Sequence, residues 1–251
     1  MEKILYEEMF RMEERHWWFA GRRQIILALF RYLSKKIKPP PPKLAICDIG
    51  TGCGIMLWEL KKNKYYEAKG IDRSEAAMEF CRQRGVTVIK GSLPEAIPFP
   101  PNSFDVVFLL DVLEHIEKDR EAVESVFRIL RDKGLLLVTV PAYPWLWTKR
   151  DEFHGHKRRY TRGLLQKLFP KEKWRIILLS HFNTFLFLPA AGLRILQKKL
   201  GLDRYAPDLF LPKEPLNTLF RTLFASEGLF LPYFSFPLGL SIILAAWKKA
   251  S

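Results

Sequence analysis

The chain has 251 residues, 48% of them hydrophobic, and a formal net charge of +14 at pH 7. This length can bury a large core in one domain or in two small ones, and the charge favours an anionic partner or surface such as nucleic acid or anionic lipid. The three cysteines, Cys47, Cys53 and Cys81, are odd in number and lack CxxC spacing, which argues against a disulfide framework and a zinc site and fits a reducing cytoplasm.

The first 37 residues predict a helix that bends at Gly21. Its acidic start differs from the basic and then apolar start of a signal peptide, so we expect none. Four ring-bearing residues in a row cannot all face one core, and some of them must cover another part of the molecule. These residues are His16, Trp17, Trp18 and Phe19. The prolines of residues 39–42 then form a stiff spacer within one domain.

A strand followed by a glycine-rich turn comes next. Residues 45–49 are apolar apart from Asp48, and glycines follow at positions 50, 52 and 54, before a helix expected over Ile55–Lys62. Glycine has no Cβ and tolerates positive φ, so such a turn lets a bulky ligand approach the backbone at the carboxyl end of a strand. The dinucleotide-binding fingerprint would place its third glycine at position 55, so the spacing disfavours a nicotinamide cofactor.

Two further predicted strands also lead to an acid. Tyr65–Ile71 leads to Asp72, close to the spacing of roughly 20 residues at which an acid can bind ribose hydroxyls. Phe104–Leu110 leads to Asp111. Three strand ends therefore carry polar side chains toward one crevice.

Together these segments resemble the class I S-adenosylmethionine-dependent methyltransferases, in particular the small-molecule branch called type 11. The resemblance covers residues 43–142, and its motifs are specific in combination. The motifs are Asp48-Ile49-Gly50-Thr51-Gly52-Cys53-Gly54, Gly70-Ile71-Asp72, Leu93-Pro94 with Pro98-Phe99, Ser103-Phe104-Asp105-Val106-Val107, and Asp111-Val112-Leu113-Glu114-His115-Ile116.

The resemblance implies an α/β, Rossmann-like fold: a seven-stranded mixed sheet with the last strand antiparallel and helices on both faces. It implies a single methyltransferase domain over residues 1–251. The expected parts of that domain are an N-terminal helical lid (1–38), a core (43–181), an aromatic-rich helical insert (182–237) and the last strand (238–249).

S-adenosyl-L-methionine is the implied cofactor. The implied cofactor-binding residues are Asp48, Gly50, Thr51, Gly52, Gly54, Asp72, Arg73, Gly91, Ser92, Leu93, Asp111, Val112 and His115. Many relatives have Asp in place of Ser92, and the hydroxyl would meet the adenine amino group without charge assistance. Asp105 lies at the start of its strand, away from the cofactor, and is expected to be structural.

The segment after the fifth predicted strand, Leu135–Val140, would overhang the crevice. Its basic residues are Lys149, Arg150, Lys157, Arg158, Arg159 and Arg162. Together with the rings at residues 16–19, its His-x-Arg-Arg-Tyr sequence resembles a subset of bacterial methyltransferases, some of them associated with polyprenol-linked sugars. That likeness is a hint about substrate class.

Histidine suits proton removal near neutral pH, so His156 is our first candidate for a general base, followed by His154, His16 or His115. Tyr160 would orient the acceptor, and Arg158 or Arg159 would hold its anionic group. The other candidates for contact with the acceptor are His16, Trp17, Trp18 and Arg22. No third ligand is evident near His154 and His156, so we expect no metal.

Two stretches without charged side chains, Ile176–Leu193 and Gly228–Trp247, are long enough to span a bilayer if helical. Prolines and glycines interrupt both, and we interpret their apolar character as two buried strands, Trp174–Ser180 and Leu240–Trp247. The insert between these strands is expected to form two or three helices, whose apolar surface beside basic residues would suit a lipid interface. Its aromatic residues are Phe182, Phe185, Phe187, Phe210, Phe220, Phe224, Phe230, Tyr233, Phe234 and Phe236.

The sequence thus predicts a cytoplasmic methyltransferase, with possible peripheral membrane contact, that acts on a small or lipid-linked anionic metabolite, such as a quinone precursor or a glycolipid intermediate. Two alternatives stay open. One is an RNA methyltransferase. The net positive charge and the Trp and Arg residues, which could stack on bases, favour it, although no base-flipping motif is visible. The other is a cofactor-binding, membrane-peripheral adaptor without catalysis. The acceptor atom and the oligomeric state stay undetermined.

Overall fold

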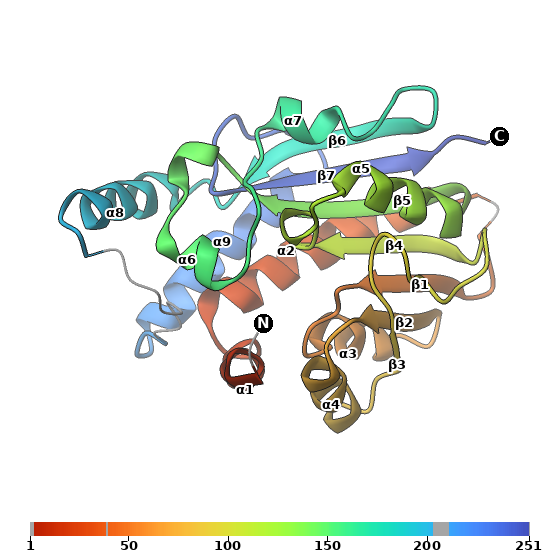
Figure 1. Ribbon diagram of the computed structural model, residues 1–251, viewed down its shortest axis with the longest axis horizontal. Helices are drawn as coiled ribbons and strands as arrows, with labels where there is room; N and C mark the ends of the chain where they lie inside the picture. The colour runs from red at the N-terminus through yellow and green to blue at the C-terminus, as the bar shows by residue number, and fades with distance from the viewer. Residues whose placement is uncertain (1–2, 39, 203–210, 251) are drawn as a thin grey trace.

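A computed structural model describes residues 3–38, 40–202 and 211–250, so Pro39 and Phe210 of the sequence-based expectations lie outside the described residues (Figure 1). Its centre is a seven-stranded sheet in the order β3-β2-β1-β4-β5-β7-β6. The strands are β1 (Leu44–Ile49), β2 (Tyr66–Asp72), β3 (Val88–Lys90), β4 (Phe104–Leu110), β5 (Leu130–Pro141), β6 (Trp174–Phe182) and β7 (Ser241–Lys248). Neighbouring strands pair in parallel except at β7, which is antiparallel to both β5 and β6. The predicted mixed sheet with an antiparallel last strand is confirmed.

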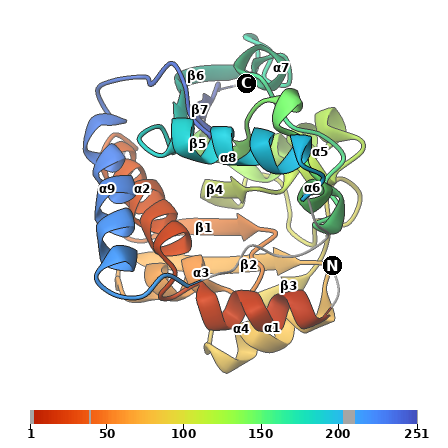
Figure 2. The ribbon, with the colours of Figure 1, turned by 90° about the vertical axis from the view of Figure 1, so that its left-hand side faces the viewer.

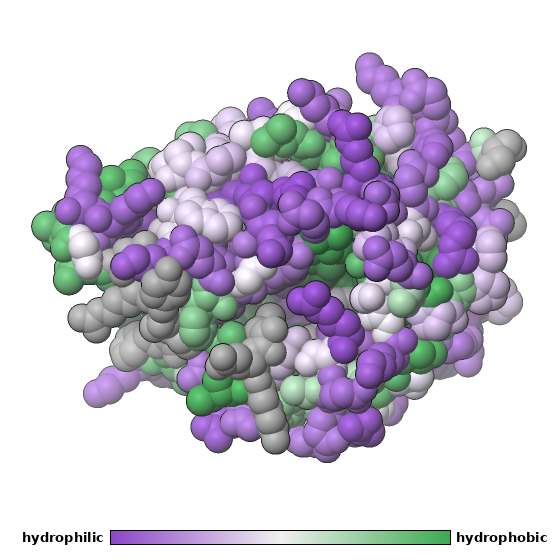
Figure 3. All heavy atoms as spheres, viewed as in Figure 1, coloured by the Kyte–Doolittle hydropathy of each residue, from purple (hydrophilic) through white to green (hydrophobic). Residues whose placement is uncertain are grey.

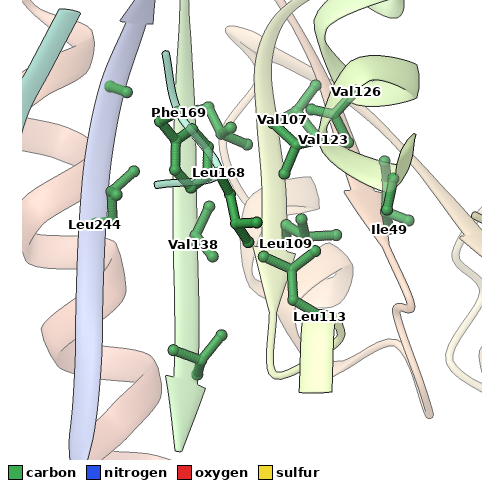
Figure 4. Packing of buried hydrophobic residues seen from close by; sticks show 14 of the residues in the cluster. Ile49, Val107, Leu109, Leu113, Val123, Val126, Val138, Leu168, Phe169 and Leu244 are labelled. Carbon is green, nitrogen blue, oxygen red and sulfur yellow. The ribbon is translucent and has the colours of Figure 1, made fainter. Parts of the chain in front are cut away.

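Helices cover both faces of this sheet. They are α1 (Lys3–Met12), α2 (Trp17–Ser34), α3 (Ile55–Lys61), α4 (Glu75–Gln83), α5 (Asp119–Ile129), α6 (Lys149–Phe153), α7 (Arg162–Gln166), α8 (Phe187–Lys199) and α9 (Leu216–Phe230), with short 3-10 turns η1 (Leu113–His115) and η2 (Pro144–Leu146). Apolar side chains of α5 and of the segment after α7 pack on one face, together with Val107, Val138 and Leu244 (Figure 4). On the other face α2 and α9 pack against Phe108 and Phe182. Because both faces are covered, β4 is a nearly continuous apolar run.

The N-terminal segment differs from the single bent helix expected from the sequence. The chain leaves the helical conformation between α1 and α2, where the His16 side chain caps α2 by accepting a hydrogen bond from the Trp18 backbone N–H. Gly21 lies inside α2, so the expected bend there is wrong. A Cβ on Gly21 would lie 2.8 Å from a ring carbon of Phe224, so this glycine allows α9 to approach α2 closely.

The insert after β6 contributes α8 and α9, which lie in different places. α9 runs beside α2 on one face of the sheet, whereas α8 lies beyond the end of β5 (Figures 1 and 2). There Phe187 and Ala191 of α8 pack against Leu146 of η2. Within the described residues, no helix combines the length and the apolar character needed to cross a membrane.

The edge at which β1, β2, β4 and β5 end is called the carboxyl edge below. Figure 2 looks onto this edge, with α1 and α4 on one side and α6 and α8 on the other. In parallel α/β sheets the carboxyl ends of the strands are where ligands bind. Asp48, Asp72 and Asp111, at or just after the ends of β1, β2 and β4, therefore lie at this edge.

Candidate functional site

The glycine-rich turn after β1 is fixed by hydrogen bonds to the next strand. The backbone N–H of Gly50 donates to the Ile71 carbonyl at 2.8 Å, and the N–H of Gly52 donates to Oδ2 of Asp72 at 2.9 Å. Gly50 has a φ of +69°, and a Cβ there would lie only 2.6 Å from Cγ2 of Val112. The turn therefore holds open a cradle that any side chain would fill, which fits close approach by a bulky cofactor.

Asp72 is a polar side chain in direct contact with this cradle, through the hydrogen bond from Gly52. Its second oxygen, Oδ1, accepts the backbone N–H of Ser74 at 2.9 Å. Burial raises the pKa of Asp72, although the N–H donors of Ser74 and Gly52 and the charge of Arg73 oppose that rise. The carboxyl group is thus oriented by the backbone before any ligand arrives.

Asp48 lies deeper, at the end of β1. Its Oδ2 accepts a hydrogen bond of 2.7 Å from the hydroxyl of Thr51, so that it ties the turn to the strand. Burial raises the pKa of Asp48 to about 7, against the hydrogen bond of Thr51 and the charge of Arg22. Asp48 is therefore an acid that changes charge close to neutral pH.

The turn is covered by α1. The thiol of Cys53 donates to the Tyr6 carbonyl at 3.4 Å, and Phe10 stacks on Phe80 of α4 with ring centroids 4.8 Å apart. A Cβ on Gly52 would lie 2.9 Å from the terminal methyl group of Met9. Within the segment expected to form an N-terminal lid, α1 lies on the glycine-rich turn, whereas α2 packs against the sheet.

The residues expected beside adenine follow β3. The backbone N–H of Gly91 donates to the Asp72 carbonyl at 3.1 Å, which places this segment next to the ribose candidate. Ser92 and Ala96 exchange two backbone hydrogen bonds of 3.0 Å, and Leu93 packs against the core. Gly91 and Ser92 thus follow directly beside the end of β2, where Asp72 lies.

At the ends of the central strands, Arg22 of α2 meets Asp111. Arg22 Nη2 lies 2.7 Å from Asp111 Oδ2 and donates to Thr139 Oγ1 at 2.9 Å, and Thr139 donates to Asp111 Oδ1 at 2.9 Å. The Trp18 ring lies 5.5 Å from the guanidinium of Arg22. Arg22, expected to contact the acceptor, is thus already paired with a carboxylate.

Three histidines gather beside η1. The rings of His115 and His156 meet edge to face with their centroids 4.8 Å apart, and the ring centroid of His154 lies 6.0 Å from that of His156. Burial and the neighbouring His156 lower the pKa values of His115 and His154 to about 4. These two imidazoles are therefore neutral at physiological pH.

Asp151 of α6 organises this group. Its Oδ1 lies 2.8 Å from His156 Nδ1 and accepts from Arg159 Nε at 2.8 Å, while its Oδ2 accepts the N–H of Thr148. Burial would raise the pKa of Asp151, but the hydrogen bond from His156 and the charge of Arg159 hold it below its ordinary value. The carboxylate fixes His156 with one ring nitrogen turned to Asp151, leaving Nε2 for a ligand or a proton.

The remaining expected contact residues make contacts within the protein. Tyr160 is buried and its hydroxyl donates to Asp119 Oδ2 at 2.9 Å, with a pKa raised by burial and by that carboxylate. Arg158 donates to the same oxygen at 3.0 Å. Trp17 packs against Phe220 and Phe224 of α9.

Sequence reasoning missed three groups that the fold brings to this site. Asp151 had a local signal, because Thr148-x-x-Asp151 is a capping box that starts α6. Glu114 lay inside a motif but was given no role, and Thr139 is a polar residue within an apolar strand. Glu114 and His115 also lie close to His156, so the sequence argument that no third metal ligand is nearby is wrong.

Residues 47–138 match the family model described as a methyltransferase domain. The uncharacterised methyltransferase YcgJ of Bacillus subtilis is 32% identical over 124 residues, which are 45% of this chain and 47% of YcgJ. The crystal structure of YcgJ has the same fold, with a TM-score of 0.54 and 19% identity over 89% of this chain and 99% of that chain.

Two relatives with more specific names differ in what they act on. A chloroplastic 2-methyl-6-phytyl-1,4-hydroquinone methyltransferase of Oryza sativa is 27% identical over 113 residues, 43% of this chain and 32% of that protein. Human EEF1A lysine methyltransferase 2 is 29% identical over 150 residues, 53% of this chain and 59% of that protein. The chain spans less than two thirds of the length of these relatives.

Proposed function

We propose that this chain, a class I S-adenosylmethionine-dependent methyltransferase by its domain over residues 47–138, methylates a small or lipid-linked metabolite that carries an anionic group. The observation that carries the proposal is a juxtaposition at one edge of the sheet. The glycine-rich turn with Asp72 lies there, and so does α8, whose exposed side chains are largely apolar. A methyl donor and an apolar acceptor would thus meet at the same edge.

On the donor side, Asp72 and the backbone of Gly50 and Gly52 would hold the cofactor. A buried, backbone-oriented carboxylate such as Asp72 suits the two hydroxyls of a ribose. S-adenosylmethionine, when bound, supplies a methyl group on a sulfonium that an in-line nucleophile can displace. The protein's own part is to position that nucleophile and to exclude water, which α1 above the turn would do.

On the acceptor side, an oxygen or acidic carbon must lose a proton. His156 Nε2 is the atom that would take this proton, because Nδ1 is turned to Asp151. His115 and His154 keep their low pKa values and serve as neutral neighbours. Arg158 and Arg159 have carboxylate partners, so either would hold an anionic acceptor only by sharing its guanidinium.

The insert supports a lipid-linked acceptor. Of the 21 large apolar side chains that are exposed in the described chain, 16 lie between Phe185 and Leu238. Leu188 of α8 and Leu229 of α9 are 76% and 70% exposed, and Lys198 and Lys199 lie in the last turn of α8. Figure 3 shows hydrophobic and hydrophilic residues side by side at the end of the molecule where α8 lies. Such a surface suits anionic lipid, and a relative's name includes a phytyl-bearing hydroquinone.

The net charge of +14 also favours nucleic acid as a second candidate acceptor. Both candidates are tested by incubating the protein with methyl-labelled S-adenosylmethionine and, separately, lipid, water-soluble and RNA extracts. Label that partitions into the lipid or anionic metabolite fraction would support the proposal. Label in RNA alone would favour the second candidate, and vesicle binding without label in any extract would favour the non-catalytic adaptor.

A further inference from the structure

Glu114, His115 and His156 bring one carboxyl group and two imidazoles together beside the cofactor edge. One ligand atom from each side chain lies within 4.8 Å of those of the other two. Glu114 and His115 belong to η1 after β4, whereas His156 follows α6. The backbone links the two segments, since the Lys157 N–H donates to the Glu114 carbonyl at 2.6 Å.

The two imidazoles are arranged as metal-binding histidines are. His156 Nδ1 faces Asp151 Oδ1 at 2.8 Å, and His115 Nδ1 faces the Gly155 carbonyl at 3.4 Å. A ring nitrogen that donates its hydrogen to a carboxylate or a carbonyl fixes the tautomer and leaves Nε2 with a lone pair. Both rings can therefore present Nε2 as a ligand atom without losing these contacts.

Glu114 supplies an independent sign that a ligand is expected here. Its side chain is 1% exposed, yet among the described residues its buried Oε2 has no hydrogen-bond partner. Such an oxygen is costly to bury unless something binds it. The two nearby guanidinium groups do not fill that place, because Arg22 is paired with Asp111 and Arg159 with Asp151.

We propose that Glu114, His115 and His156 bind one divalent transition-metal ion, for which two imidazoles and one carboxylate are a suitable donor set. Zinc is the ion that this set fits best, with bonds of about 2.0–2.2 Å, so the three groups draw closer together when it binds. Three protein ligands leave an open coordination position for a water or an acceptor oxygen.

The ion changes the chemistry of the neighbouring site. It occupies the lone pair of His156 Nε2 that would otherwise take a proton. An acceptor hydroxyl bound at the open position would instead lose its proton to solvent on coordination, because a divalent ion lowers the pKa of a bound hydroxyl. The site itself requires only the three ligands and is independent of methyl transfer.

The test uses the full-length protein without an affinity tag. Cobalt(II) is titrated into metal-free protein while its visible absorption is recorded, and zinc is then added as a competitor. We expect one cobalt ion per chain, displaced by zinc. Glu114→Gln and His156→Ala should each weaken binding by more than the roughly 10–100-fold typical of losing a second-shell partner, and Asp151→Asn should fall within that range.

His154→Ala is the matched control, because it removes a neighbouring imidazole that is outside the cluster. It should bind cobalt as the wild type does. Absence of saturable cobalt binding, or equal binding by wild type and Glu114→Gln, would overturn the proposal. Titration of S-adenosylmethionine into the same preparations separates the two conclusions. Absence of S-adenosylmethionine binding would remove the proposed function and leave the metal site standing.

Discussion

Arg22 Nη2 lies 2.7 Å from Asp111 Oδ2 and donates to Thr139 Oγ1, which ties α2 to the carboxyl ends of two central strands. Arg22→Met keeps the apolar stem but leaves Asp111 without its cation. We expect the free energy of unfolding to fall by roughly 1.5–3 kcal/mol, as for hydrogen bonds to charged groups. Urea unfolding of Arg22→Met, Asp111→Asn and the double variant measures this, and purely additive effects would contradict a direct pair.

Asp72→Asn should weaken S-adenosylmethionine binding. The amide has one acceptor oxygen and no charge where the carboxylate has two acceptor oxygens and a charge, so we expect a loss of about 1.5–3 kcal/mol, or roughly 10–100-fold in affinity. Calorimetric titration with S-adenosylmethionine and S-adenosylhomocysteine measures it. Asp105→Asn is the control, because Asp105 binds the Ala45 N–H and Arg131 at the opposite end of the strands. An equal loss in both variants would argue against a specific role of Asp72.

Gly50→Ala should reduce both stability and cofactor affinity. The new Cβ meets Val112 at 2.6 Å and the residue keeps a positive φ, which alone costs about 1–2 kcal/mol. Gly155→Ala has a similar φ of +72° but nothing within 4 Å, so it isolates the backbone cost. Thermal unfolding should show a larger loss for Gly50→Ala, partly rescued by Val112→Ala. Equal losses at the two glycines would contradict the steric argument.

Stability should fall as the pH rises from about 4 to about 7, because Asp48 has a pKa of about 7 in the fold. The unfolded chain releases this proton near the ordinary Asp pKa of about 3.9, so between the two values the native state holds one more proton. The contribution of Asp48 to the free energy of unfolding is fully present below about pH 4 and is lost as the pH approaches 7. This loss is at most roughly 4 kcal/mol. Urea unfolding at several pH values tests this, and Asp48→Asn should remove this component. Identical pH slopes in both proteins would contradict it.

The insert should bind anionic vesicles. Leu188→Asp in α8 and Leu229→Asp in α9 each place a charge on an exposed apolar side of one helix of the insert. The variant whose helix meets the membrane should bind vesicles about 10-fold more weakly or worse, since a buried leucine contributes roughly 1.5–3 kcal/mol. Flotation with anionic and neutral vesicles measures it. Tyr65→Asp is the control, because Tyr65 is 59% exposed and lies next to β2 at the opposite edge. Loss of binding in this variant alone would place the membrane contact elsewhere.

The sequence predicts the central sheet well, because its signals are local. β4 was expected over the same residues that the structure assigns, and Asp105 takes its expected structural role by holding the Ala45 N–H. β5 begins earlier than expected, since Leu130 already pairs with Phe104. A buried strand is visible in sequence as a run of apolar residues, whereas its exact start depends on a partner strand.

The acceptor side could not be predicted in the same way. Glu114 meets His156 only because the turn after β4 and the segment after α6 lie side by side. The arginines expected to bind an anion acquire partners, such as Asp119 for Arg158, that no local pattern reveals. Which charged groups are already paired is a property of the assembled fold.

Because α2 packs against α9, which is far along the chain, α2 is made well before its packing partner. The Trp17 N–H donates to Asn217 Oδ1, its partner 200 positions later. At about 5–20 residues per second, a ribosome needs roughly 10–40 s to make the chain between them. During that interval the side of α2 that carries Ile25 has no α9 to cover it. The nascent chain must therefore keep this surface of α2 from premature association until α9 has been made.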